Sequence, residues 1–278
     1  MLKPIFADGK KKAVTFSYDD GITQDRRLVE IFNKYGMKCT FNLNSGKFGI
    51  EAPANGFNKP VSHNKIAAAE VAELYIGHEV AVHTLTHPRL QYLSKDTIRD
   101  EILEDRKNLE ALVKYPVSGM AYPFGTYNDL VLAVMRECGI KYSRTVEQTK
   151  TFGYPQDFLR WHPTVHFGDE NMDFLTNKFL NLENESTSGS LLPIYYIWGH
   201  SYELDGNDSW EQMENLCNKL SNDANTWFAT NGELVTYYEA LKACTYSADE
   251  MHVKNNSAIS LWFEIDGKPC EVKPGEYI

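Results

Sequence analysis

Cysteine is scarce in this sequence, and its distribution argues against a disulfide framework. The 278 residues contain five cysteines, an odd number, and these are widely separated along the chain with no CxxC pair. Scattered thiols are typical of reduced cysteines, whereas disulfide-stabilised scaffolds carry regularly spaced, even-numbered sets. We therefore expect reduced thiols.

Long hydrophobic runs and an excess of basic residues are absent as well. No run approaches the roughly 18 to 20 apolar residues that a membrane-spanning helix needs, and the N-terminal stretch MLKPIFADGKKKAVTF lacks the apolar segment of a signal peptide. The formal net charge of −10 disfavours nucleic-acid partners, because they are held by phosphate contacts with basic side chains. We expect no membrane span, no nucleic-acid partner and a cytoplasmic location, or secretion if a leader was removed; the oligomeric state stays open.

What the sequence does contain is an alternation of short β-rich runs with helical patterns. Residues 13–18 are the first expected strand, and the helical pattern that follows stops at Gly36. Such alternation generates parallel strands with crossover helices. Six or more units along the chain predict an α/β fold with a closed or nearly closed barrel, although an open doubly wound sheet would gather the same strand ends.

The last part of the chain departs from this rhythm. From about Cys244 onward, apolar and polar residues alternate around Asp266 and Gly267, which is a β-hairpin pattern. We expect a barrel over residues 1–243 and, over 244–278, a small C-terminal β appendage that packs on the barrel as a hairpin.

Reactive side chains gather at the expected C-terminal ends of the strands. Asp19 and Asp20 end the first strand, His83 and His87 bracket the end of the third, and His200 ends a late one. Two imidazoles and a carboxylate are ligands for a divalent transition metal and leave a position open for water. HxxxH spacing alone is weak, and adjacent aspartates also occur in ordinary turns, so the interpretation depends on the combination.

The aspartate doublet makes a further structural demand. Side chains of neighbouring strand residues point to opposite faces of a sheet. The backbone must therefore leave regular strand geometry near Asp20 if Asp19 and Asp20 serve one site, and Gly21 permits such a turn.

Four segments together resemble the polysaccharide deacetylase superfamily, carbohydrate esterase family 4. They are TFSYDDG, GHEVAVHTLTHPRL, YPFGTYND and the late strand that ends in His200, and the resemblance covers roughly residues 13–241. It implies a distorted (β/α)7-type barrel and metal-dependent hydrolysis of acetyl groups on N-acetylated sugars, of the chitin-oligosaccharide, peptidoglycan or poly-N-acetylglucosamine type. The implied cofactor is one divalent transition metal, zinc first, with Co²⁺, Mn²⁺ or Ni²⁺ as alternatives.

The resemblance also implies a role for each matching residue. Catalysis is assigned to Asp19 as general base, to the backbone N–H of Phe124 as oxyanion donor, and to His200 as the acid that protonates the leaving amine. The implied metal ligands are Asp20, His83 and His87.

The substrate-binding residues are where this sequence departs from the family. Many members have an arginine that contacts the base where this chain has Ala121, and Arg160 is the candidate replacement. Trp198 occupies the place of a small aliphatic residue, so we expect a narrower or differently shaped acetyl pocket. Trp161 is the residue expected to form the aromatic wall of that pocket, with ordinary core packing as the alternative. Tyr122 is also expected to contact the substrate.

Several alternatives stay open. His162 and His166 repeat the HxxxH spacing without a carboxylate doublet, so we expect structural or substrate-contacting roles and no second metal site. The same barrel could hydrolyse O-acetyl esters or small amides, and the missing arginine leaves room for a sugar-binding or regulatory protein without strong activity. A purely structural protein is the least favoured reading, because the polar strand ends would then meet without a chemical reason.

Overall fold

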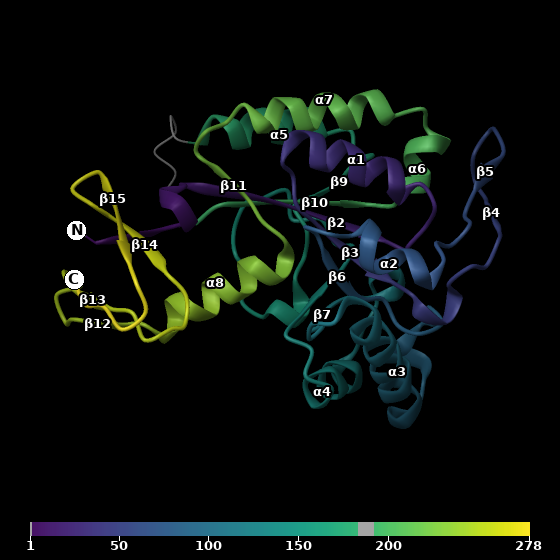
Figure 1. Ribbon diagram of the computed structural model, residues 1–278, viewed down its shortest axis with the longest axis horizontal. Helices are drawn as coiled ribbons and strands as arrows, with labels where there is room; N and C mark the ends of the chain where they lie inside the picture. The colour runs from purple at the N-terminus through teal and green to yellow at the C-terminus, as the bar shows by residue number, and fades with distance from the viewer. Residues whose placement is uncertain (1, 183–191) are drawn as a thin grey trace.

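A curled sheet of parallel strands forms the centre of the molecule (Figure 1). The computed structural model describes residues 2–182 and 192–278. Neighbouring strands follow the order β8-β7-β6-β3-β2-β10-β9, and β11 pairs with the beginning of β2. Every one of these pairings is parallel, as the alternation of strands and helices predicts. The strands are β2 (Lys12–Asp19), β3 (Cys39–Leu43), β6 (Glu79–Val82), β7 (Gly119–Ala121), β8 (Tyr142–Arg144), β9 (Val165–His166), β10 (Ile194–Gly199) and β11 (Thr226–Phe228).

Residues 161–166 connect the two edges of the sheet, at β8 and at β10. Trp161 forms a parallel bridge with Arg144 at the end of β8, and β9, which follows, pairs with β10. The sheet thus curls into the distorted (β/α)7-type barrel that was expected. Because the strands are parallel, their C-terminal ends lie at one rim, and the residues that follow them come together.

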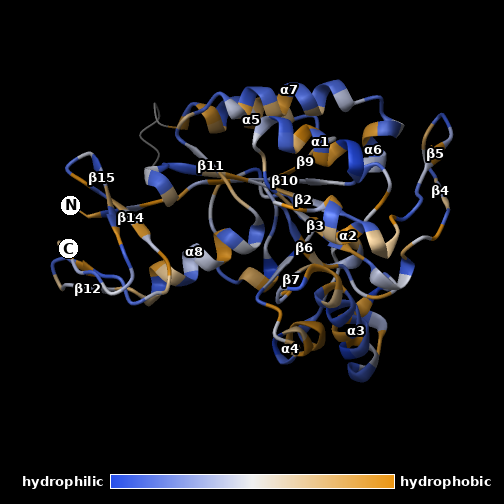
Figure 2. Cartoon of the chain, in the orientation of Figure 1, coloured by the Kyte–Doolittle hydropathy of each residue, from blue (hydrophilic) through white to orange (hydrophobic). Residues whose placement is uncertain are grey.

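Helices cover the outside of this sheet through their apolar faces. In α1, Leu28, Ile31 and Phe32 are buried, and the helix ends at Gly36, whose φ of 67° is the left-handed conformation typical of helix ends. The hydroxyl of Ser94 accepts a hydrogen bond from the N–H of Thr97 and so caps the start of α3. Figure 2 shows hydrophobic and hydrophilic segments alternating along outer helices such as α3 and α7. The helices are α1 (Asp25–Tyr35), α2 (Val71–Leu74), α3 (Lys95–Val113), α4 (Asp129–Glu137), α5 (Met172–Leu180), α6 (Ser201–Gly206), α7 (Trp210–Ser221) and α8 (Asn231–Ala243).

The C-terminal appendage is a three-stranded antiparallel sheet that also takes in the N-terminus. The predicted hairpin is confirmed: β14 (Leu261–Ile265) pairs with β15 (Lys268–Val272), and Asp266 and Gly267 form the turn with φ of 49° and 76°. The appendage expected over residues 244–278 also takes in a strand from the other end of the chain, because β1 (Lys3–Ile5) pairs with the other edge of β14. Two small strands, β12 (Thr245–Tyr246) and β13 (Val253–Lys254), complete this region.

One tyrosine joins the appendage to the barrel. The hydroxyl of Tyr237 in α8 donates to the carbonyl of Ile5 at 2.7 Å and accepts from the N–H of Trp262 at 3.0 Å. Phe6 and Phe263 are fully buried in the same apolar cluster. The appendage therefore rests on α8, on the side away from α3 and α4 (Figure 1).

The remaining segments are short. The long loop after β3 carries a small hairpin, β4 (Pro53–Ala54) with β5 (Val61–Ser62), which stands out from the barrel in Figure 1. Single 3₁₀ turns occupy Ala7–Gly9, Ser45–Lys47, Ala68–Glu70, Leu90–Tyr92, Pro123–Gly125 and Phe158–Arg160. Among residues 2–182 and 192–278, no helix combines the length and apolarity needed to cross a membrane.

Candidate active site

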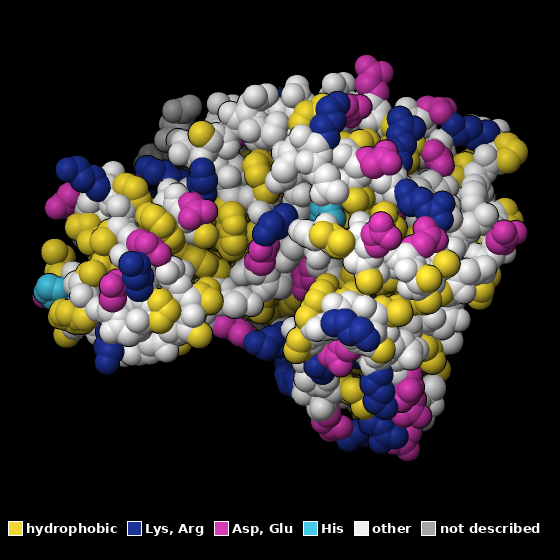
Figure 3. All heavy atoms as spheres, viewed as in Figure 1, with side chains coloured by type: hydrophobic (Ala, Val, Ile, Leu, Met, Phe, Trp, Pro, Cys, Tyr) yellow, Lys and Arg dark blue, Asp and Glu magenta, His cyan; other side chains and the backbone are white. Residues whose placement is uncertain are grey.

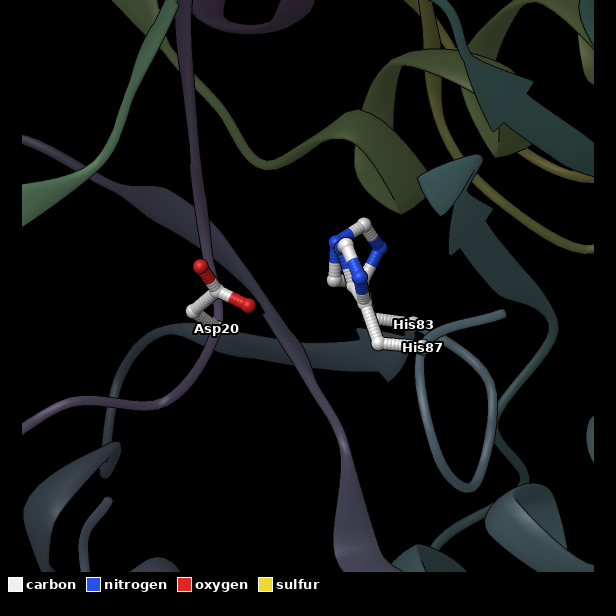
Figure 4. Close-up of side chains that lie close together, drawn as sticks. All are labelled: Asp20, His83 and His87. Carbon is white, nitrogen blue, oxygen red and sulfur yellow. The ribbon is translucent and has the colours of Figure 1, made fainter. Parts of the chain in front are cut away.

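Asp20, His83 and His87 converge at the C-terminal rim of the barrel. One ligand atom from each of the three side chains lies within 4.8 Å of the other two. In Figure 4 the two imidazole rings stand together opposite the Asp20 carboxylate. An oxygen and two imidazole nitrogens are a donor set that fits a divalent transition metal, so these residues are suited to hold the cation that the resemblance implies.

The backbone around these residues leaves regular geometry at three non-glycine positions. β2 ends at Asp19, and Asp20 has a φ of 84°, as the doublet requires if both carboxylates are to serve one site. Thr84 and His87 also have positive φ values of 66° and 62°, and the hydroxyl of Thr84 accepts the N–H of His87 at 3.1 Å. Such conformations cost free energy and cluster at functional sites.

The orientation of His83 is set by two neighbouring groups. Its Nδ1 lies 2.8 Å from the carbonyl oxygen of Ala121 in β7, and its backbone N–H donates to the carboxylate of Asp105 in α3 at 3.0 Å. Because a carbonyl only accepts, Nδ1 carries the ring proton and Nε2 is left as a ligand atom. Burial lowers the pKa of both His83 and His87, the latter to about 3, so both imidazoles are neutral, as metal binding requires.

Two groups that sequence reasoning missed bind the carboxylate of Asp20. Nε2 of His63 lies 3.1 Å from Oδ2, and the ammonium group of Lys65 lies 3.1 Å from Oδ1 and 2.8 Å from the backbone carbonyl. Burial opposes ionisation of Asp20, but the His63 hydrogen bond and the Lys65 charge outweigh it and hold the pKa well below its usual value. Both residues follow β5, at the end of the long loop after β3.

Asp19 is held by a different cation from the one predicted. The guanidinium of Arg144, the last residue of β8, is fully buried and forms an ion pair with Oδ2 of Asp19. The side-chain amide of Asn42 donates to Oδ1 at 2.9 Å. Burial would raise the pKa of Asp19, but the charge of Arg144 outweighs it and lowers this pKa. Asp19 is therefore an ionised carboxylate beside the group formed by Asp20, His83 and His87.

Arg144 takes the place that was assigned to Arg160. Ala121 and Arg144 are register partners in the adjacent strands β7 and β8. Arg144 therefore lies one strand away from Ala121, the position where the resemblance leads one to expect an arginine, and at the same level of the barrel. Arg160 lies outside the cluster, with its side chain about half exposed, and contacts Asp129 at 3.5 Å. Sequence reasoning missed Arg144 because strand register could not be read from the residue pattern.

The aromatic residues expected at the substrate divide into two groups. Trp161 and Tyr122 are buried, with 2% and 1% exposure; Trp161 packs edge-on against Tyr142, and the hydroxyl of Tyr122 donates to Leu159. Both are packed in the core, and the structure does not bring them to the cluster. Trp198 does lie at the site, with the Arg144 guanidinium 4.4 Å from its ring centre.

His200 and Phe124 complete the rim. Nε2 of His200 lies 3.9 Å from Oδ2 of Asp19. Phe124, in the Pro123–Gly125 turn, has a φ of 59°, and its ring centre lies 4.7 Å from that of His87. The structure thus brings together every residue expected to act in catalysis or metal binding, together with Trp198.

His162 and His166, the second pair with HxxxH spacing, have different partners. Nδ1 of His162 lies 2.6 Å from the hydroxyl of Thr145. His166 instead belongs to a second group of potential ligand atoms, with His200 and Glu203, that lie within 4.8 Å of one another. Hydrogen bonds within this group account for its geometry, since Nε2 of His166 lies 3.0 Å from Glu203.

A groove of about 560 Å³ lies at the other end of the barrel. It is lined in part by His78 and Ser118, which precede β6 and β7, and by Tyr237 and Ile259. Figure 3 shows the molecule hollowed between the appendage and the lobe that carries α3 and α4. Because sites in such barrels form at the C-terminal ends of the strands, this groove is separate from the candidate site.

Comparison with known sequences agrees with the resemblance drawn from the motifs. Residues 7–143 match the family model for polysaccharide deacetylase. A peptidoglycan-N-acetylglucosamine deacetylase from Bacillus cereus is 28% identical over 153 residues. This match covers 54% of the chain and 61% of that relative, so the chain spans less than two thirds of the relative's length.

Solved structures share the fold at low sequence identity. A candidate polysaccharide deacetylase from Mycobacterium smegmatis superposes with a TM-score of 0.60 at 15% identity, over 86% of this chain and 94% of that one. A carbohydrate esterase family 4 pseudoenzyme from Bacillus anthracis has a TM-score of 0.50 at 19% identity, over 83% of this chain and 66% of that one. Since a pseudoenzyme has this fold, activity has to be argued from the site itself.

Proposed function

The chain belongs to the polysaccharide deacetylase superfamily, and from that premise we propose that it is a metal-dependent hydrolase that removes acetyl groups from N-acetylated sugars. One observation carries this function. Asp20, His83 and His87 bring their ligand atoms within 4.8 Å of one another, while the neighbouring carboxylate of Asp19 forms an ion pair with Arg144. A metal ligand and a proton acceptor are thus supplied from one strand end.

The metal ligands in this proposal are Asp20, His83 and His87, with zinc as the first candidate and cobalt, manganese and nickel as alternatives. A divalent metal held there would polarise the acetyl carbonyl and lower the pKa of a bound water toward about 7. The hydrogen bond from His83 to the carbonyl of Ala121 supports this role, because metal-binding histidines commonly donate their second N–H to such an acceptor.

Asp19 accepts the proton of the attacking water. The ion pair with Arg144 and the amide of Asn42 keep its carboxylate ionised and fixed in direction. Since Asp19 does not belong to the group proposed to hold the metal, its carboxylate can accept a proton, which a carboxylate coordinated to a metal ion does poorly.

Two further roles, those of proton donor and oxyanion donor, belong to His200 and Phe124. His200 donates a proton to the departing amine, and interactions with Glu203, Asp19 and Asp20 outweigh burial to raise the pKa of His200 to about 9, so the imidazole is protonated at neutral pH. The N–H of Phe124 donates to the oxyanion as the carbonyl becomes tetrahedral.

Acetate release from a substrate panel tests this function. The chain is stripped of metal, reloaded with zinc, cobalt, manganese or nickel, and assayed on acetylated chito-oligosaccharides, peptidoglycan fragments, acetylated xylan and small cyclic amides. We expect release from the N-acetylated sugars, dependent on added metal and lost in Asp19→Asn. Release only from acetylated xylan, or ring opening of a cyclic amide, would replace the proposal with an O-acetyl esterase or a small-amide hydrolase. No turnover on any substrate would favour a sugar-binding protein.

A further inference from the structure

Glu203 binds two imidazoles at the rim of the barrel. Its Oε1 lies 3.1 Å from Nδ1 of His200, and its Oε2 lies 3.0 Å from Nε2 of His166. Oε2 also accepts the backbone N–H of His200 at 3.1 Å. His166, the last residue of β9, and His200, the residue after β10, are therefore both bound by a single carboxylate in the first turn of α6.

The second partner of His166 fixes its tautomer. Nδ1 of His166 accepts the backbone N–H of Gly168 at 3.1 Å, so the ring proton is on Nε2 and is donated to Glu203. His166 can make this contact as a neutral ring. Burial opposes ionisation of Glu203, but the hydrogen bonds from His166 and His200 outweigh it and lower its pKa, so Glu203 is a carboxylate.

An ionised Glu203 dictates which nitrogen of His200 serves the site. A carboxylate only accepts hydrogen bonds, so Nδ1 of His200 must carry a proton. Nε2 is then the nitrogen left for the site, 3.9 Å from Oδ2 of Asp19. Contacts with the rings of Trp198 and Tyr202, whose centres lie 5.7 Å and 5.2 Å away, hold the imidazole from the sides.

We infer, on the basis of the proposed function, that Glu203 supported by His166 is the positioning residue for the general acid: it holds His200 with Nδ1 protonated and Nε2 presented to the substrate. Glu203 lies only three residues after the histidine, and nothing in the motif pattern distinguishes it from an ordinary helix-capping residue. The capping contact and the imidazole contact use the same carboxylate, so the start of α6 and the orientation of His200 are fixed together.

Charges from several elements act on His200. Burial lowers its pKa, and the hydrogen bond and charge of Glu203 are the strongest contributions that raise it. The carboxylates of Asp19 and Asp20 at the end of β2 act in the same direction. Further titratable or charged groups near the ring are His166 on β9, which shares Glu203 with it, Tyr202 on α6, and Arg144 on β8, which pairs with Asp19.

Glu203→Gln tests this role in the full chain. The glutamine keeps an oxygen that can accept the N–H at the start of α6 but lacks the charge. The pKa of His200, followed by NMR of its ring in the full-length protein, should fall from about 9 toward the ordinary 6.5. The alkaline limb of the kcat/KM profile should move down by about two pH units with it, because the acid is lost at lower pH. His162→Leu is the matched control and should move neither, since His162 contacts Thr145 instead.

The two readouts separate this inference from the proposed function. The titration needs no substrate, so a shifted His200 with no acetate release from any substrate would reject the function and leave the positioning role intact. A His200 pKa that stays near 9 in Glu203→Gln would overturn the positioning role even if turnover falls, because Glu203 would then only cap α6. A second equivalent of bound zinc that disappears in Glu203→Gln would also overturn it, since the three side chains would then form a cation site.

Discussion

Replacing Arg144 by methionine should destabilise the protein strongly. Arg144 is fully buried and pairs with Asp19, whose side chain is 4% exposed; it also donates to the hydroxyl of Ser17 at 3.2 Å and to the carbonyl of Thr145 at 3.1 Å. Removing one partner of a buried ion pair leaves an uncompensated charge and costs about 3 to 5 kcal/mol. At roughly 2 to 4 °C per kcal/mol for chains of comparable size, this corresponds to a fall in Tm of about 6 to 20 °C.

Urea unfolding of four proteins measures this contribution: the wild type, Arg144→Met, Asp19→Asn and the double variant. Because the double variant contains neither charge, its loss of stability should be smaller than the sum of the two single losses by about 1 to 3 kcal/mol. Arg160→Met is the matched control; its side chain is about half exposed and its partner Asp129 is almost fully exposed, so its free energy of unfolding should change by less than about 0.5 kcal/mol. A loss below about 1 kcal/mol in Arg144→Met, or strict additivity with Asp19→Asn, would refute the assignment of Arg144 as the cation that holds Asp19.

Three further predictions concern metal binding, catalysis and pH. His83→Ala should lose the bound cation in metal analysis while His162→Ala retains it; a full equivalent in His83→Ala would remove that histidine from the ligand set. Asp19→Asn and His200→Ala should each lower kcat by roughly 100- to 10,000-fold with metal content unchanged, and wild-type turnover in either variant would exclude that role. Burial raises the pKa of Asp25 from 3.8 to about 7, so its native carboxyl keeps a proton that the unfolded state loses, and the contribution of this group to stability should fall as pH rises from about 4 to 7, by up to about 4 kcal/mol. The free energy of unfolding of the wild type minus that of Asp25→Asn should therefore decrease over this range in urea unfolding series, and a difference that does not change with pH would contradict the prediction.

The sequence was sufficient to predict the fold and the gathering of the polar residues because both depend on local patterns. Strand and helix periodicity predicts parallel strands, and in parallel strands Asp19, Asp20, His83 and His200 all fall at the same rim. The turn at Asp266 and Gly267 was readable for a similar reason, since the dipeptide specifies its own backbone conformation.

What the sequence did not reveal depends on register and burial. Arg144 could be found only from its pairing opposite Ala121 in the neighbouring strand, and Glu203 only from its distance to two histidines. An aromatic side chain such as Trp161 packs equally well in a core or against a ligand, so its residue type could not distinguish the two. The pairing of β1 with β14 joins opposite ends of the chain, which no local pattern records.

The most direct test of the account is a crystal structure of the zinc-loaded full chain with anomalous diffraction at the zinc edge. We predict a single anomalous peak at about 2.0 to 2.2 Å from a carboxylate oxygen of Asp20 and from one ring nitrogen each of His83 and His87, with both oxygens of Asp19 outside the coordination sphere. A peak among His166, His200 and Glu203 instead, or a zinc ion bound by Asp19 in place of Asp20, would contradict it.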